Sequence, residues 1–239
     1  MQLRILLTHH MPLGWSATGQ EVSRLAAELR RQGHHVRCLV VDRAPADRGS
    51  ADADQESVRR IVCDPDSPTA QLKFRLPTFG PADSGEPVNN GEPAENNSHH
   101  AGTTSFAALS DAELAAYRDV LREVLDDEVA RFNPHVIHGQ HIWIQGHLAL
   151  EAGVPYLLTA RGPELDLQAS DGRYRRYAQE AAENAGRIIA PDEQVHRAVT
   201  ATFGDLDHRV VVVPDDRPQR IEELYEEVLR ARFGSDFQP

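Results

Sequence analysis

Short apolar runs alternate with amphipathic segments along most of the 239-residue chain. The apolar runs have the length of buried strands, and the segments between them carry apolar residues at helical spacing. Strands and helices that alternate in this way are joined by right-handed crossovers and form a parallel sheet covered by helices. The pattern therefore predicts an α/β fold, with one doubly wound (Rossmann-like) parallel sheet and helices on both faces.

About seven strands fit this pattern. They are expected at residues 3–8, 35–41, 57–63, 135–139, 155–160, 187–190 and 209–213. Helices are expected between them, the first at 18–34 and the longest at 109–132. Thr18 and Ser110 are the expected N-caps of these two helices, because each is followed three residues later by a glutamate.

The chain divides into one domain and a short C-terminal addition. The domain is expected to span residues 1–216, and within it residues 80–105 hold too few apolar side chains to pack, which predicts a mobile loop. Residues 217–239 are expected to form a helix and a tail. The helix has an apolar stripe to bury, which consists of Ile221, Leu224, Tyr225, Val228 and Leu229.

Composition excludes some classes of partner and location. The formal net charge is -12, with 37 acidic against 25 basic residues, which disfavours nucleic acid and anionic membranes as partners. Cys38 and Cys63 lie in apolar, strand-like runs and are expected to be buried thiols of a reducing compartment. No apolar run reaches membrane-spanning length and no signal peptide is recognisable, so we expect a cytoplasmic protein without a transmembrane segment.

Ligands of doubly wound sheets bind at the carboxyl ends of the strands, so the loops there hold the candidate residues. The loop at residues 9–19 contains Gly14 and Gly19. These glycines either let an anion such as a phosphate approach the helix N-terminus or only shape a long turn. Because neither a G-x-G-x-x-G nor a P-loop motif is present, a dinucleotide dehydrogenase or a P-loop NTPase is disfavoured.

Histidines are concentrated in the stretch "HVIHGQHIWIQGH", at His135, His138, His141 and His147. A spacing of three suggests a metal site, but a strand and a loop do not place such residues on one face, and no cysteine or H-E-x-x-H motif accompanies them. We therefore expect no metal and no cofactor. His138 and His141, where a strand opens into a loop, are expected to face a ligand, and His135 can be purely structural.

The stretch "LLTARGPELD" ends a buried strand with charged residues at its carboxyl edge. Arg161 could clamp an anion or a sugar hydroxyl, Glu164 could orient a hydroxyl, and Gly162 would permit close approach. The alternative is that the arginine and the glutamate form a surface pair beside a turn. Trp15, Trp143 and Arg161 are also expected on an exposed face that contacts solvent or another chain.

Four stretches, in the same order along the chain, resemble the N-terminal domain of family-4 glycosyltransferases, which are retaining enzymes of the GT-B fold. They are "RILLTHHMP…TGQEVSRLAAELRRQGHHV", "FNPHVIHGQHIWIQG", "GVPYLLTARGPELD" and "AENAGRIIAPDEQVHRAVTATFG…RVVVVPDD". The resemblance runs from Met1 to about Asp216. It implies that the second, donor-binding domain of such enzymes is absent from this chain, and that the last helix corresponds to the one that crosses back to the first domain.

The chain departs from the family pattern at positions that bear on activity. The glycine pair of the family's first loop corresponds to Thr18-Gly19, and its His-Gly pair corresponds to Arg161-Gly162. Its serine after the sixth strand falls at or near Asp192. An arginine cannot share a proton as a histidine can, which weakens the expectation of an ordinary active site.

The resemblance implies the acceptor-side half of a retaining glycosyltransferase that uses a nucleotide-sugar donor and needs a separate donor-binding chain. Arg161 and Glu164 would be its catalytic residues. Its binding residues would be Gly14, Gly19, His138, His141, Gly162 and Asp192. The expected partners are a sugar or glycolipid acceptor and either a donor-domain chain or a second copy. One alternative is a non-catalytic domain that binds a sugar, an acceptor or a protein partner, and another is a stand-alone small-molecule enzyme.

Overall fold

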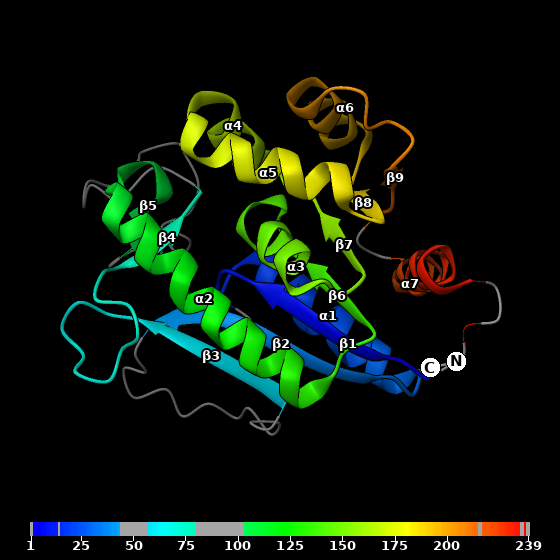
Figure 1. The fold of residues 1–239 in the computed structure, drawn as a ribbon, viewed down its shortest axis with the longest axis horizontal. Helices are drawn as coiled ribbons and strands as arrows, with labels where there is room; N and C mark the ends of the chain where they lie inside the picture. Colours follow the sequence, from blue (N-terminus) through cyan, green and yellow to red (C-terminus); the bar gives the residue numbers. More distant parts are fainter. Residues whose placement is uncertain are drawn as a thin grey trace.

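The computed structural model describes residues 2–13, 15–43, 57–79, 103–214, 217–234 and 237. Its main sheet has seven strands, all parallel, in the order β3-β2-β1-β6-β7-β8-β9 (Figure 1). The strands are β1 (Arg4–His9), β2 (His35–Arg43), β3 (Val58–Cys63), β6 (Val136–Gly139), β7 (Tyr156–Thr159), β8 (Arg187–Ala190) and β9 (Val210–Val212). Every strand lies where the sequence predicted one, and the α/β doubly wound fold is confirmed.

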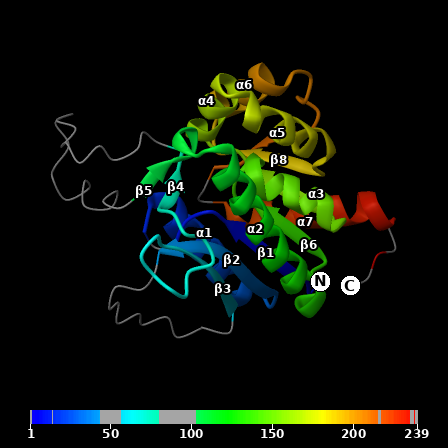
Figure 2. The ribbon, with the colours of Figure 1, turned by 60° about the vertical axis from the view of Figure 1, so that its left-hand side comes forward.

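Helices cover both faces of this sheet (Figures 1 and 2). One face carries α1 (Ala17–Arg31) and α7 (Pro218–Phe233). The other carries α2 (Asp111–Phe132), α3 (His147–Ala152), α4 (Gly162–Ser170), α5 (Gly172–Asn184) and α6 (Glu193–Phe203). Side chains alternate between the faces along β1: Ile5 and Leu7 pack toward α1 and α7, whereas Leu6 packs toward the opposite core.

The strand order reverses between β1 and β6. The chain moves from β1 outward to β2 and β3 and then returns to pair β6 against the other side of β1. Thr8 is level with Gly139 in that pairing, and the Gln140 amide donates to the Thr8 carbonyl over 2.9 Å. The residues after these two strands therefore meet at the point where doubly wound sheets bind ligands.

A second, two-stranded sheet corrects the expectation of a loop over residues 80–105. Thr103–Ser105 forms β5, which pairs in parallel with β4 (Leu76–Thr78). The short helical turn η3 (Phe106–Ala108) follows directly, and its Phe106 side chain is fully buried. The pairing of β5 with β4 and the burial of Phe106, one residue beyond the window, order residues 103–105, and the composition of residues 80–105 alone does not include this apolar side chain. Residues 80–102 lie outside the described residues.

The N-cap of α2 is the predicted residue, whereas the N-cap of α1 differs from the prediction. Ser110 caps α2 with a complete capping box, because its Oγ accepts from the Glu113 amide and the Glu113 carboxylate accepts from the Ser110 amide. Helix α1 begins earlier than expected. Its N-cap is Ser16, whose extended backbone lets its Oγ accept from the Gly19 amide over 3.0 Å, while Thr18 lies inside the helix and hydrogen-bonds to that same Oγ.

The C-terminal helix α7 buries its apolar stripe on the α1 side of the sheet, which confirms the predicted helix and its buried face. All five predicted positions are buried: Ile221, Leu224, Tyr225, Val228 and Leu229. A polar contact adds to this packing, because His34, after α1, lies 3.0 Å from the Glu222 carboxylate. None of the helices in the described ranges is long and apolar enough to cross a bilayer.

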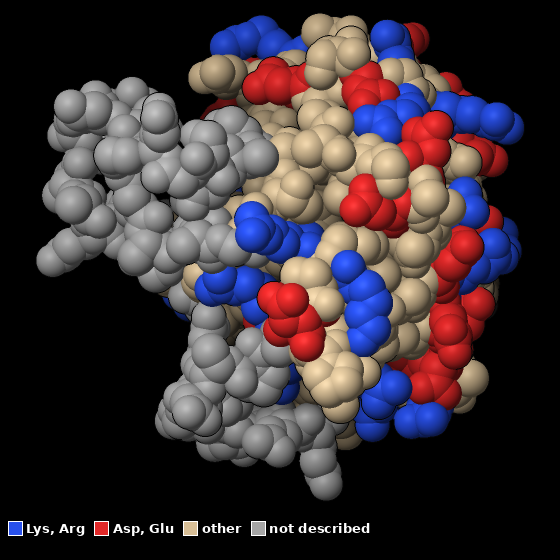
Figure 3. Space-filling view, turned by 90° about the vertical axis from the view of Figure 1, so that its left-hand side faces the viewer, with Lys and Arg blue, Asp and Glu red and all other residues tan. Residues whose placement is uncertain are grey.

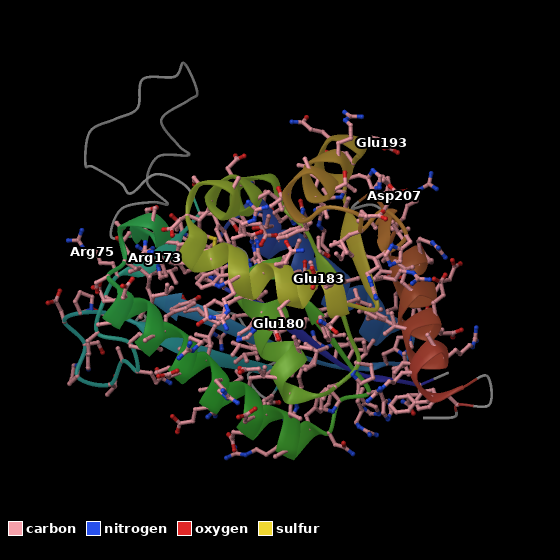
Figure 4. The ribbon with its side chains drawn as sticks, turned by 45° about the horizontal axis from the view of Figure 1, so that its top comes forward. Arg75, Arg173, Glu180, Glu183, Glu193 and Asp207 are labelled. Carbon is pink, nitrogen blue, oxygen red and sulfur yellow. The ribbon has the colours of Figure 1, made fainter. Side chains whose placement is uncertain are left out.

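Outside the core, ion pairs join elements that are distant in the sequence. Arg173, at the start of α5 (Figure 4), pairs with Asp171 at 2.7 Å and Asp111 at 3.1 Å, and donates to the Leu109 carbonyl. This arginine thereby fastens the start of α2 to α5. On the face drawn in Figure 3, basic and acidic side chains are interspersed.

Candidate functional site at the carboxyl edge of the sheet

The carboxyl ends of β1, β6 and β7 bring together several predicted site residues with His9 and His10, which were not predicted. Gly139 ends β6 at a position with no room for a side chain, since a Cβ there would lie 2.9 Å from the Leu158 side chain and 3.3 Å from Gln145. The helical turn η4 (Ile142–Gly146) follows, and His141, the residue just before it, lies over the end of β1 with its ring beside those of His9 and His10. The site is thus built at the reversal point of the strand order.

His138 lies on β6 and is fully buried on the side of α7. Its Nδ1 is 2.9 Å from the Tyr225 hydroxyl and its Nε2 is 2.8 Å from the Thr159 hydroxyl, so both ring nitrogens have partners. Burial, with a smaller contribution from the nearby positive charge of Arg161, lowers the pKa of His138 to about 3. This imidazole is therefore neutral at physiological pH and can exchange hydrogen bonds but not act as an acid.

Arg161 follows β7 and reaches across to α1. Its guanidinium lies 2.8 Å from the Glu21 carboxylate, and both side chains are largely shielded from solvent. The two residues line a pocket of about 280 Å³, together with Arg24, His138 and Gln140. The alternative of an exposed Arg161–Glu164 surface pair is therefore wrong, because Glu21 is the partner and Glu164 is fully buried.

Glu164 lies in the first turn of α4 and organises the backbone around it. Its carboxylate accepts from the amides of Ile142 at 2.9 Å, Arg161 at 3.0 Å and Trp143 at 3.3 Å. Burial raises the pKa of this carboxyl to about 8, although the backbone donors oppose that effect. Among the described residues, the walls of the 280 Å³ pocket do not include Glu164, so its visible role is to hold η4 against α4.

His9, His10 and His141 form a compact group on the opposite side of the sheet edge from His138. Each offers a ligand atom within 4.8 Å of the others, and the rings of His10 and His141 have centroids 4.2 Å apart. All six ring nitrogens are buried without a hydrogen-bond partner. Burial lowers the pKa of each imidazole well below its usual value; the neighbouring rings add to this effect on His9 and His10, and the positive charge of Arg161 adds to it on His9 and His141.

Other predicted binding residues lie further from this group. The Gly19 amide belongs to the first turn of α1, two residues before Glu21, and is occupied by Ser16. Gly162 begins α4 with open space around its Cα, so nothing in the described part of the chain requires a glycine there. Asp192 caps α6 by accepting from the Val195 amide over 2.8 Å, and Gly14 lies outside the described residues.

The expected exposed surface around the tryptophans is wrong. Trp143 is 1% exposed and packs among aromatic rings, with centroids 4.6 Å from Tyr174 and 5.0 Å from Phe106. Trp15 is 8% exposed and lies beneath the guanidinium of Arg43. Both indoles belong to the core, because the loops that carry them fold inward over the sheet edge.

Comparison with known protein families shows which family the sequence matches. Residues 16–216 match the family described as "Glycosyl transferase 4-like domain", which covers most of the chain. The chain belongs to this family. No curated protein matches the chain.

Solved structures similar to this glycosyl transferase 4-like domain include three larger proteins, each matched over about half of its length. A sucrose-phosphate synthase from Thermosynechococcus elongatus matches with a TM-score of 0.51 and 14% identity, over 89% of this chain and 48% of the other. A lipopolysaccharide outer core galactosyltransferase, WaaB, in its apo form gives 0.49 and 10%, over 89% and 45%. HepE from Anabaena, solved with UDP and glucose, gives 0.48 and 14%, over 90% and 44%. The chain spans about half the length of these proteins, and the first likeness supports the fold.

Sequence reasoning missed three residues of the site in this glycosyl transferase 4-like domain. His9 and His10 were passed over because they end the first strand, far from the histidine-rich stretch. The strand order would have found them, since β1 and β6 are neighbours and their carboxyl ends must meet. Glu21 was considered only as part of a helix cap, whereas in the fold it is the partner of Arg161.

Proposed function

We propose that this domain is the acceptor-side half of a retaining glycosyltransferase, which transfers a sugar from a nucleotide-sugar donor together with a separate donor-binding domain. The observation that supports this most directly is the polar pocket at the carboxyl edge, where Arg161 and His138 line the wall. Doubly wound sheets bind ligands at this edge, and the family match gives the ligand class. The acceptor is a sugar or a glycolipid headgroup.

The pocket residues suit recognition of hydroxyl groups and of developing negative charge. The guanidinium of Arg161 is held by Glu21 at 2.8 Å, so it is a cation in a fixed place rather than a mobile side chain. A fixed cation stabilises the charge that develops on a departing diphosphate without reorganisation. Helix α1 also contributes Arg24 to the lining of the same pocket, which adds a second positive charge there. The buried free thiols Cys38 and Cys63 suit a cytoplasmic location.

One experiment tests the proposal through release of nucleoside diphosphate. The purified domain is incubated with UDP-, GDP- and ADP-sugars, alone and with a donor-type glycosyltransferase domain from the same genome. We expect no release above background from the domain alone and release when the two domains are mixed with an acceptor. Arg161→Ala should reduce that release at least tenfold, whereas Arg197→Ala, an exposed arginine on α6, should leave it unchanged.

Sustained release by the pure domain alone would contradict the half-enzyme proposal and favour a stand-alone enzyme. A second candidate function is a non-catalytic domain that binds a sugar or a partner. This candidate is favoured by the position of Glu164. Its carboxylate accepts hydrogen bonds from three backbone amides and does not line the pocket. Saturable binding of a sugar or a donor-type chain, with no release in any mixture, would support this second candidate.

A further inference from the structure

The group formed by His9, His10 and His141 is not explained by sugar transfer. These three side chains are between 2% and 3% exposed and lie outside the 280 Å³ pocket. A neutral imidazole carries one donor and one acceptor, and here neither has a partner on any of the three rings. Buried polar groups without partners are rare in folded proteins, and each one calls for a specific explanation.

His138 shows that this sheet edge can satisfy a buried imidazole when the role is structural. It lies on the same strand end, three residues before His141, and both of its nitrogens are hydrogen-bonded to hydroxyls. The three clustered rings have one another as close polar neighbours instead. A buried ligand common to all three rings would need one nitrogen of each ring close to the same place, and one ligand atom of each lies within 4.8 Å of the others.

We propose that His9, His10 and His141 bind one divalent transition-metal ion, with zinc as the best-fitting metal. The three ligand atoms lie within 4.8 Å of one another, a spread that small side-chain rotations convert to the separations found around one ion. Three imidazoles with an open fourth position are a known zinc ligand set. A purely nitrogen donor set selects against calcium and magnesium, which prefer oxygen ligands.

The surroundings of the group suit a metal ion in two further respects. An oxygen of the Glu164 carboxylate lies 3.6 Å from Nδ1 of His141. A small movement would let this carboxyl group accept from Nδ1, an arrangement that orients an imidazole so that its other nitrogen, Nε2 of His141, binds the metal. Phe79 and Phe106 enclose the other side, with ring centroids 4.6 Å and 5.8 Å from that of His10. Such an apolar wall limits access of water.

Binding of an ion would be affected by the charged groups near the three histidines. Three neutral imidazoles leave both positive charges of the ion uncompensated, and the Glu164 carboxyl group, 3.6 Å from Nδ1 of His141, is an acidic group beside them. The positive charge of Arg161 acts on His9 and His141, but its guanidinium is paired with Glu21 at 2.8 Å. The ion would join the end of β1 to η4 and so fix the sheet edge beside the sugar pocket.

Metal binding is tested on the full chain without an affinity tag, since a histidine tag would itself bind zinc. Metal content is measured after purification, and the chelator-treated protein is then titrated with zinc sulfate and with cobalt chloride. We expect about one zinc ion per chain, a cobalt complex with the visible absorption of a tetrahedral site, and a rise of about 5 °C in the thermal midpoint at saturating zinc.

The variants His10→Gln and His141→Gln should each bind zinc at least about 100-fold more weakly. His138→Gln is the matched control, because it removes a buried imidazole from the same strand end whose nitrogens are already occupied, and it should bind zinc as the wild type does. The proposal is overturned if folded wild-type protein binds neither metal, or if His138→Gln weakens binding as much as the other two. None of these readouts depends on sugar transfer, so failure of the proposed function leaves this test intact.

Discussion

The carboxyl end of β6 separates two groups of buried histidines that differ in how their ring nitrogens are satisfied. On the side of α7, His138 is bound by Tyr225 and Thr159 and is complete within the protein. On the aromatic side, His141 meets His9 and His10, and the structure gives none of these rings a hydrogen bond. Burial is nearly the same on the two sides, so burial alone does not show whether the nitrogens of a histidine have hydrogen-bond partners.

The two sides also differ in what holds them in place. The environment of His138 depends on α7, because Tyr225 belongs to that helix. The histidine group depends on a cluster of rings around Phe106 and Trp143. The comparison can therefore be tested by removing one support at a time.

Loss of Trp143 should have the largest effect, because it supports the aromatic side. This side chain is 1% exposed and contacts three other aromatic rings. Trp143→Ala should lower the free energy of unfolding by about 3–5 kcal/mol, as large-to-small core substitutions do. Urea midpoints measure this, with the exposed Phe233→Ala as control, which should change stability by less than about 0.5 kcal/mol. An unchanged midpoint for Trp143→Ala would contradict the aromatic core described here.

Loss of Leu224 tests the other side through α7. Its side chain is fully buried against the sheet face that also holds α1. Leu224→Ala should cost about 2–4 kcal/mol. The neighbouring Glu223→Ala, on the exposed side of α7, is the control in the same urea titration. If Leu224→Ala leaves the midpoint unchanged, α7 is not held on the domain and the environment of His138 needs another explanation.

Sequence patterns predicted most of this architecture because apolar periodicity reports directly on burial. The seven strands and the stripe of α7 both follow from side chains that must leave water. The site was predicted less completely, since it depends on which strand ends become neighbours. His138, His141 and Arg161 were named from their positions at strand ends, but the meeting of His9 and His10 with His141 requires the strand order.

The periodicity of apolar residues also could not predict that side chains in the loops point into the core. Trp143 was expected at the surface because it follows a strand end, yet η4 turns back over the sheet. The cause is a buried carboxylate, because Glu164 accepts the amides of Ile142 and Trp143 and draws that turn inward. A contact between residues some twenty positions apart leaves no local pattern in the sequence.

Replacing one histidine from each side by leucine compares the two environments directly. In metal-free protein, His138→Leu leaves the hydroxyls of Tyr225 and Thr159 without that partner and should cost about 2–3 kcal/mol. His10→Leu removes ring nitrogens that have no partner and replaces them by apolar atoms, so it should change stability by less than about 1 kcal/mol. Urea unfolding with a chelator present measures both. Equal costs would mean that the clustered rings are satisfied in solution, for example by water.

The smallest predicted effect is on how the free energy of unfolding depends on pH. The pKa of His138 is lowered by burial from its ordinary 6.5 to about 3. Between these values the unfolded chain takes up a proton that the folded protein refuses, so the stability from this group is present above pH 6.5 and is lost as the pH falls toward 3. One such group contributes about 1.4 kcal/mol per pH unit within that window.

His138→Gln should therefore be less stable than wild type at pH 7.5 but should lose less stability on acidification, so that the two curves converge toward pH 5. Tyr225→Phe is the control, because it removes one hydrogen bond and keeps the buried imidazole, and its curve should run parallel to that of the wild type. Urea unfolding in the presence of a chelator, at pH 7.5, 6.5 and 5.5, measures the three slopes. Parallel curves for wild type and His138→Gln would show that His138 takes up its proton in the folded state as readily as in the unfolded chain. That result would contradict the lowered pKa.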